Sequence, residues 1–172
     1  WAFYDWANSA FATTVMAGFF PVFFKQYWNA GVVATESTFR LGLTSGLASL
    51  LAASGWWGLH LVARYTGAPL FALDLAVAPI WAHSFLMLFT VFPTFFLGFL
   101  FTTYPRWMNG PLVPRGAYVA APFLLTAATA VWLAGVHAGI ALQIAAAALA
   151  ATGLATALVA LLRVLKKKEK IV

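Results

Sequence analysis

The sequence has no cysteine and very few charged residues. Without cysteine there is no disulfide framework, no thiolate metal site and no thiol nucleophile, so any bound metal would need histidine, carboxylate or methionine ligands. Charged residues make up 8% of the 172 residues and hydrophobic residues 63%, whereas an ordinary soluble domain is about 25% charged. This composition predicts an integral membrane protein and leaves no stretch long enough for a soluble domain.

Motifs of common catalytic sites are absent as well. The chain contains no G-x-S-x-G, H-E-x-x-H, Walker or G-x-G-x-x-G pattern. The segment GLTSG at residues 42–46 has its serine one position too late for a nucleophile elbow. Nothing in the sequence therefore indicates hydrolysis or phosphoryl transfer, and we expect that the protein is not an enzyme.

Long uncharged runs predict an all-α, polytopic membrane protein with about five transmembrane helices. Roughly 20 apolar residues are needed to cross a hydrocarbon core about 30 Å thick. A polar connection at residues 29–40 separates the first two spans, and Gly153 and Ala157, four residues apart, predict a close-packing face in the last. The expected spans are residues 5–28, 41–63, 79–104, 117–135 and 138–162.

The basic residues fall almost entirely on one side of the predicted membrane. Alternating spans leave Arg64 alone on one side, and the positive-inside rule then predicts an outer N-terminus and a cytoplasmic C-terminus in a bacterial inner membrane. We expect the tail at residues 166–170, KKKEK, to contact anionic lipid of the bilayer, and we expect no nucleic-acid partner. The basic residues on the other side are Lys25, Arg40, Arg106, Arg115, Arg163, Lys166, Lys167, Lys168 and Lys170.

The same alternation places all three histidines at the membrane face opposite the basic tail. His60 lies near the end of the second span, His83 near the start of the third, and His137 in a loop-like GVHAG between the fourth and fifth. Neutral imidazoles are good ligands for haem iron and copper, so these side chains are candidates for a cofactor site. The alternative is that each histidine simply lies at the headgroup interface near a helix end.

A polar seam runs along the third span. The residues that share this helix face, at spacings of four, three and four, are His83, Met87, Thr90 and Thr94. Met87 is either a soft metal ligand or a gap filler. Pro93 removes the usual donor to the carbonyl of Phe89, so the threonine hydroxyls either serve that group or bond back to their own helix.

Residues 54–165 resemble the NnrS family, bacterial inner-membrane proteins associated with haem and copper and with the response to nitric oxide. The most specific match is WAHSFLMLFTVFPTFFLGFLFTTYPRWMN at residues 81–109. That family commonly begins this helix with a His-x-His-Glu pattern. Here His83 matches the second histidine, Trp81 occupies the first histidine position and Ser84 the glutamate position. The resemblance implies haem or copper binding with His83 as a ligand.

The first 53 residues resemble a different family, the major-facilitator transporters of the branch related to vacuolar amino-acid effluxers. The match is carried by YDWANSAFATTVMAGFFPVFFKQYW and the following STFRLGLTSGLASLLAA. We therefore expect two regions, 1–53 and 54–172, and, because Trp1 begins an already apolar run, residues upstream of it. In a transporter, Asp5, Asn8 and Ser9 would line a substrate path; alternatively, they cap the first helix.

Three functional interpretations follow. The first is an NnrS-like membrane protein that holds haem or copper through His83 with His60 or His137. The second is a fragment of a major-facilitator transporter, and the third is a helical membrane bundle without biochemical activity.

Overall fold

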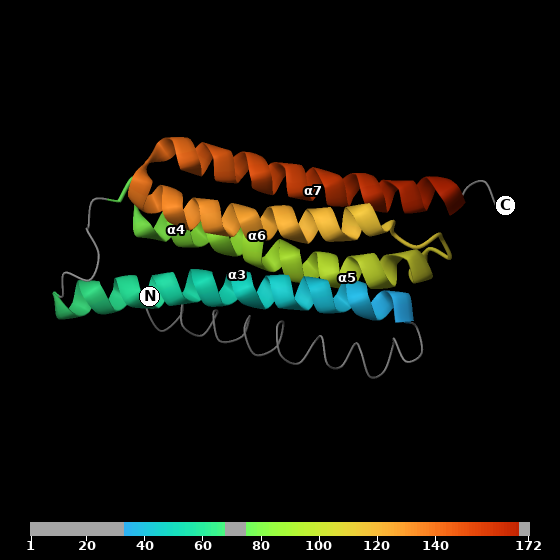
Figure 1. Ribbon diagram of the computed structural model, residues 1–172, viewed down its shortest axis with the longest axis horizontal. Helices are drawn as coiled ribbons and strands as arrows, with labels where there is room; N and C mark the ends of the chain where they lie inside the picture. The colour runs from blue at the N-terminus through green and yellow to red at the C-terminus, as the bar shows by residue number, and fades with distance from the viewer. Residues whose placement is uncertain (1–32, 68–74, 169–172) are drawn as a thin grey trace.

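The computed structural model describes residues 33–67 and 75–168, which form a bundle of long antiparallel helices (Figure 1). Helices α4, η2 and α5 follow one another without a break and together make one rod of the bundle. The described residues contain no strand, and the predicted all-α class is confirmed. The elements are α3 (Val33–Thr66), α4 (Pro79–Phe85), the π-helix η2 (Leu86–Val91), α5 (Phe92–Trp107), α6 (Arg115–Ala138) and α7 (Ile140–Lys168).

Four helical segments of the described chain are long and apolar enough to cross a membrane. They are Thr38–Thr66, Pro79–Trp107, Arg115–Ala138 and Ile140–Lys166, and they coincide with the second to fifth predicted spans. The first predicted span, residues 5–28, lies outside the described residues. The count therefore agrees with the prediction of about five spans.

Two predicted loops are helical instead. Helix α3 already begins at Val33, so the polar connection predicted for residues 29–40 is wrong from that residue onward. No glycine or proline interrupts residues 33–40, and polar residues are tolerated where a helix extends beyond the hydrocarbon core. His137 likewise lies in the last turn of α6 rather than in a loop. The helix ends at Ala138, and the next residue, Gly139, has a φ of 125°, a conformation that glycine adopts readily.

The hydrogen-bond pattern changes in the middle of the rod made by α4, η2 and α5. In η2 the N–H of Phe92 donates to the carbonyl of Met87, five residues earlier, which is the π-helical spacing. The Thr90 hydroxyl donates to the carbonyl of Leu86 at 2.7 Å, and the Thr94 hydroxyl donates to that of Thr90 at 2.6 Å. Both threonines therefore bond back to their own helix, and the alternative in which they serve the Phe89 carbonyl is wrong.

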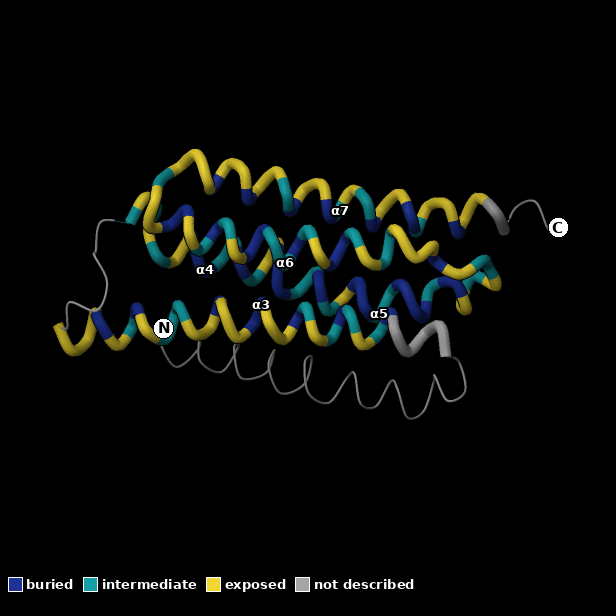
Figure 2. The backbone as a smooth tube through the Cα atoms, in the orientation of Figure 1, coloured by how far each residue is buried: buried dark blue, intermediate teal, exposed yellow. Residues whose placement is uncertain are grey.

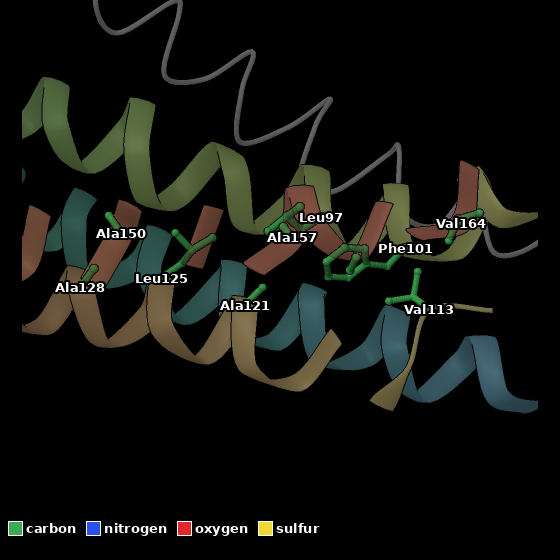
Figure 3. Close-up of a cluster of buried hydrophobic side chains, with 10 residues drawn as sticks. Leu97, Phe101, Val113, Ala121, Leu125, Ala128, Ala150, Ala157 and Val164 are labelled. Atoms are coloured by element: carbon green, nitrogen blue, oxygen red, sulfur yellow. The ribbon is translucent and has the colours of Figure 1, made fainter. Parts of the chain in front are cut away.

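The bundle has two buried apolar clusters along its length. The first joins α5, α6 and α7 through residues such as Leu97, Leu125 and Ala157 (Figure 3). The second surrounds Trp132 and includes Leu86 of η2. Figure 2 shows that buried residues lie on the helix faces toward the bundle interior, while the outer helix faces are exposed. Many of the exposed residues are large and apolar. Such a surface is compatible with lipid.

Small residues allow α6 and α7 to pack closely. A Cβ atom added at Gly153 would lie 3.2 Å from the carbonyl oxygen of Ala121 on α6. Ala157, one turn further along α7, is also buried. The close-packing face predicted for Gly153 and Ala157 is therefore present, as expected for helices that associate in a membrane.

Candidate functional site

The fold brings all three histidines to one end of the bundle. His60 lies near the end of α3, His83 lies within α4, and His137 lies in the last turn of α6. Because α3 and α6 run the same way and α4 begins where they end, these segments meet at the left of Figure 1. The placement of the histidines at one membrane face follows from this arrangement.

Two adjacent indoles connect the histidines. The Trp57 ring stacks on the His83 ring, with centroids 4.6 Å apart and planes 20° apart. It also lies 6.0 Å from the His60 ring, which stacks on Trp56 at 5.7 Å. We call these residues and His137 the histidine–tryptophan cluster. Each buried imidazole in it rests against an aromatic face.

Trp56 holds His137 by a directional contact. Its indole N–H donates to Nε2 of His137 at 3.1 Å, and the two rings meet edge to face with centroids 6.5 Å apart. An imidazole nitrogen that accepts a hydrogen bond carries the lone pair, so in neutral His137 the proton is on Nδ1. Nε2 of His137 is therefore engaged by the protein itself.

The three histidines differ in exposure. His60 is 7% exposed and His83 is 9% exposed, whereas His137 is exposed. Ionisable side chains inside a membrane protein are costly and usually have a function. His60 and His83 are thus the pair on which a functional interpretation rests.

The donors fit some metal centres and not others. Within the described part of the chain, no group of three or more His, Cys, Asp or Glu side chains is arranged to hold a metal ion. A tetrahedral zinc site needs three or four protein ligands, whereas haem iron needs one or two and copper(I) is satisfied by few, soft donors. The buried pair His60 and His83 therefore does not make up a closed tetrahedral site.

Met87 is placed in the packing of the bundle. Its side chain is half-buried and packs against the second apolar cluster, beside Leu86 and Trp132. It lies one turn after His83 on the same rod, so its thioether shares the helix face of that imidazole. Its packing role is shown, and its role as a ligand stays a prediction.

The other predicted positions divide into two groups. Trp81, at the first histidine position of the family pattern, is 70% exposed, and Ser84, at the glutamate position, is half-buried. Asp5, Asn8 and Ser9, the predicted substrate path, lie outside the described residues.

The two tryptophans of the cluster were missed by the sequence interpretation. A signal for them exists, because Trp56 and Trp57 precede His60 by four and three residues, and residues at these spacings share a helix face. What the spacing does not provide is their contact with α4 and α6, which depends on how the helices pack.

The basic residues of the described chain are concentrated at the end of the bundle opposite the histidine–tryptophan cluster. Arg64 lies at the same end as the cluster. The basic residues at the other end are Arg40, Arg106, Arg115, Arg163 and Lys166 (Figure 1). The described part thus keeps the charge asymmetry that the sequence predicts.

These features define a class of protein. The chain is a polytopic helical membrane protein with two buried imidazoles and two indoles at one end and a basic rim at the other. Within that class it belongs to the NnrS family, because the family described as NnrS protein matches residues 33–171.

A second likeness concerns a transporter. The uncharacterized MFS-type transporter YxiO of Bacillus subtilis (strain 168) is 38% identical to this chain over 68 residues, which are 39% of this chain and 16% of that protein. The match thus spans less than a fifth of the transporter. No solved structure matches the chain significantly.

Proposed function

We propose that this NnrS-family chain binds haem or copper through His83 and His60 at one face of the membrane. The observation that carries the proposal is the contact of Trp57 with both of these buried imidazoles, which come from two different helices. Membership of a family associated with haem and copper supports it further.

The residues of the cluster would have different roles in binding haem or copper. His83 and His60 would supply the nitrogen ligands, and Met87 a soft sulfur ligand on the same helix face. Trp56 and Trp57 fix the ring planes and exclude water from them. When bound, haem iron or copper would supply a redox-active centre with affinity for small diatomic molecules such as nitric oxide.

The proposed location is the bacterial inner membrane with the C-terminus in the cytoplasm. The basic rim at one end of the bundle supports this orientation, because cytoplasmic ends of membrane helices carry an excess of Lys and Arg. The histidine–tryptophan cluster then faces the outer side. We further propose that the protein acts by binding rather than as an enzyme, and that its basic tail contacts anionic lipid.

Titration of the detergent-purified protein tests the binding proposal. Haem and copper(I) would be titrated separately into the wild-type protein and the variants His60→Ala, His83→Ala and His137→Ala. Binding of one of the two groups to the wild-type protein, lost in His83→Ala and weakened at least tenfold in His60→Ala, is the expected result. His137→Ala is the matched control, because Nε2 of His137 is engaged by Trp56, and it should bind like the wild type.

Failure of the wild-type protein to bind either group would reject the proposal. Equal binding by wild type and His83→Ala would reject the assigned ligand. If the wild type binds neither group and the three histidine variants differ from it in stability alone, the results support a bundle without biochemical activity.

The second candidate function is that of a transporter fragment. The likeness to YxiO is the observation that favours it. Asp5, Asn8 and Ser9 would then line a substrate path, and alternating access would need both halves of a complete carrier. Sequencing of the complete gene decides the matter: further major-facilitator helices would support the transporter.

A further inference from the structure

A groove lies between α6 and α7, in the half of the bundle that carries the basic rim. Its volume is about 580 Å³. Pro114, Gly116 and Ala117 line it at the start of α6, and residues of α7 from Thr152 to Arg163 line its other wall. The groove is remote from the histidine–tryptophan cluster, since the two lie toward opposite ends of α6. It is therefore a separate candidate site.

The wall contributed by α7 is apolar in chemistry despite two threonines. The Thr152 hydroxyl donates to the carbonyl of Ala148 at 2.7 Å, and the Thr156 hydroxyl donates to the carbonyl of Thr152 at 2.8 Å. Both donors are thus satisfied within their own helix, and with Ala155 and Val159 the wall offers mainly methyl groups. A surface without unsatisfied donors suits a hydrocarbon chain.

The end of the groove near the membrane surface is positively charged. Arg163 lines it and is exposed, and Arg115 immediately precedes the lining residue Gly116. Among the described residues, no acidic side chain lines the groove, and the first turn of α6 contains none. An anionic group at this end would therefore be attracted by the arginines. No described carboxylate that lines the groove would compete with it for Arg163.

We propose that this groove binds one anionic phospholipid. The headgroup phosphate pairs with Arg163, with Arg115 beside it, and an acyl chain lies along the methyl-lined wall of α7. Charge and polarity thus match a single amphipathic ligand, charged at the surface and apolar toward the middle of the bundle. Basic pockets between helices on the cytoplasmic side are known to bind anionic headgroups. The site is distinct from the tail at residues 166–170 and is independent of haem or copper binding.

Native mass spectrometry of the full chain released from detergent tests the proposal. Phosphatidylglycerol and phosphatidylcholine with identical acyl chains would be titrated in parallel. The wild-type protein should bind phosphatidylglycerol more tightly, and Arg163→Gln should weaken its binding about fivefold with less effect on phosphatidylcholine. Ala155→Phe, which fills the groove, should weaken the binding of both lipids.

Two variants serve as matched controls. Ala147→Phe places the same side chain at an exposed alanine of α7 that does not line the groove, and Arg64→Gln removes an arginine at the other end of the bundle. Both should bind phosphatidylglycerol like the wild type. Circular dichroism of each variant confirms that the helices remain folded.

Three results would overturn the proposal. One is equal affinity of the wild-type protein for the two lipids, and another is an unchanged phosphatidylglycerol affinity in both Arg163→Gln and Ala155→Phe. The third is full displacement of phosphatidylglycerol by millimolar inorganic phosphate, because the groove would then hold a free anion and the acyl chain would contribute nothing.

Discussion

At the scale of single residues, Trp56 and Trp57 decide how the histidines are presented. Trp57 contacts both buried imidazoles, and Trp56 occupies the Nε2 atom of the exposed one. An indole offers a rigid apolar face together with one N–H donor, so these neighbouring residues combine packing with a directional hydrogen bond. The buried pair, His60 and His83, is thereby distinguished from His137.

Removal of the indole N–H of Trp56 should lower the stability of the protein while an aromatic ring still packs in the cluster. Trp56→Phe keeps an aromatic ring but loses the donor to His137, and we expect the free energy of unfolding to fall by about 1 kcal/mol, the usual net value of a hydrogen bond. Unfolding in mixed detergent micelles, followed by circular dichroism, measures the change.

The exposed Trp81 provides the control. Its side chain is 70% exposed, so Trp81→Phe should alter the free energy of unfolding by less than about 0.5 kcal/mol. Equal effects of the two substitutions would show that the contact between Trp56 and His137 contributes nothing to stability.

Residue patterns in the sequence identify the candidate histidines but not their surroundings. Helix alternation alone predicts that His60, His83 and His137 share a membrane face, and the structure brings them together through indole contacts. The stacking of Trp57 on His83 could not be predicted, because it joins α3 to α4 and depends on the rotation of each helix. For the same reason, the sequence does not reveal that position 81 faces outward.

At the scale of helices, α3 and α5 cross at a pair of glycines. A Cβ atom added at Gly42 would lie 2.6 Å from the Cα atom of Gly98. Backbone atoms cannot move away as a side chain can, so the close approach of the two helices requires glycine at this crossing. The contact links α3 to α5 in the half of the bundle opposite the histidine–tryptophan cluster.

Substitution at this crossing should separate the two helices. Gly42→Ala should lower the free energy of unfolding by about 1–3 kcal/mol, the usual cost of inserting atoms into a packed contact. Gly58→Ala is the matched control on the same helix, because nothing lies within 4 Å of a Cβ atom at that position. It should be neutral or stabilising by up to about 1 kcal/mol, since alanine favours a helix more than glycine.

Unfolding of the two alanine variants in mixed micelles provides the measurement. A Gly42→Ala protein as stable as Gly58→Ala would contradict the crossing geometry.

The length of the uncharged runs predicts where the membrane-spanning helices lie, but it does not predict where each helix begins or where its hydrogen-bond pattern changes. Uncharged runs located the spans that the structure confirms, because a membrane helix needs a fixed apolar length. The continuation of α3 back to Val33 was missed, since polar residues outside the hydrocarbon core carry no length signal. The π-helical turn at Leu86–Val91 was missed as well. Pro93 predicted a disturbance there but not its form.

At the scale of the whole molecule, the bundle is polarised along its axis. The two buried imidazoles and the two indoles of the cluster lie at one end, and the basic rim and the groove of α6 and α7 lie at the other. If the basic rim is cytoplasmic, as the positive-inside rule requires, the cluster faces the outer side. Orientation thus decides which compartment would deliver haem, copper or a small ligand to the histidines.

The absence of cysteine makes this orientation easy to measure. Single cysteines can be introduced as Arg64→Cys near the cluster and Arg115→Cys at the basic rim, with no native thiol to label. We expect a membrane-impermeant thiol reagent to label Arg64→Cys in intact spheroplasts, and Arg115→Cys after permeabilisation alone. The reverse pattern would place the C-terminus outside and contradict the proposed topology.

The most direct test of haem or copper binding through His83 and His60 is an absorption spectrum, with metal analysis, of protein purified from cells supplied with haem precursor. We expect a Soret band or stoichiometric copper in the wild-type protein, and the loss of that signal in His83→Ala while the helical circular dichroism is retained. A wild-type protein that is folded, colourless and free of copper would contradict this expectation, and would indicate that the histidine–tryptophan cluster only packs the end of the bundle.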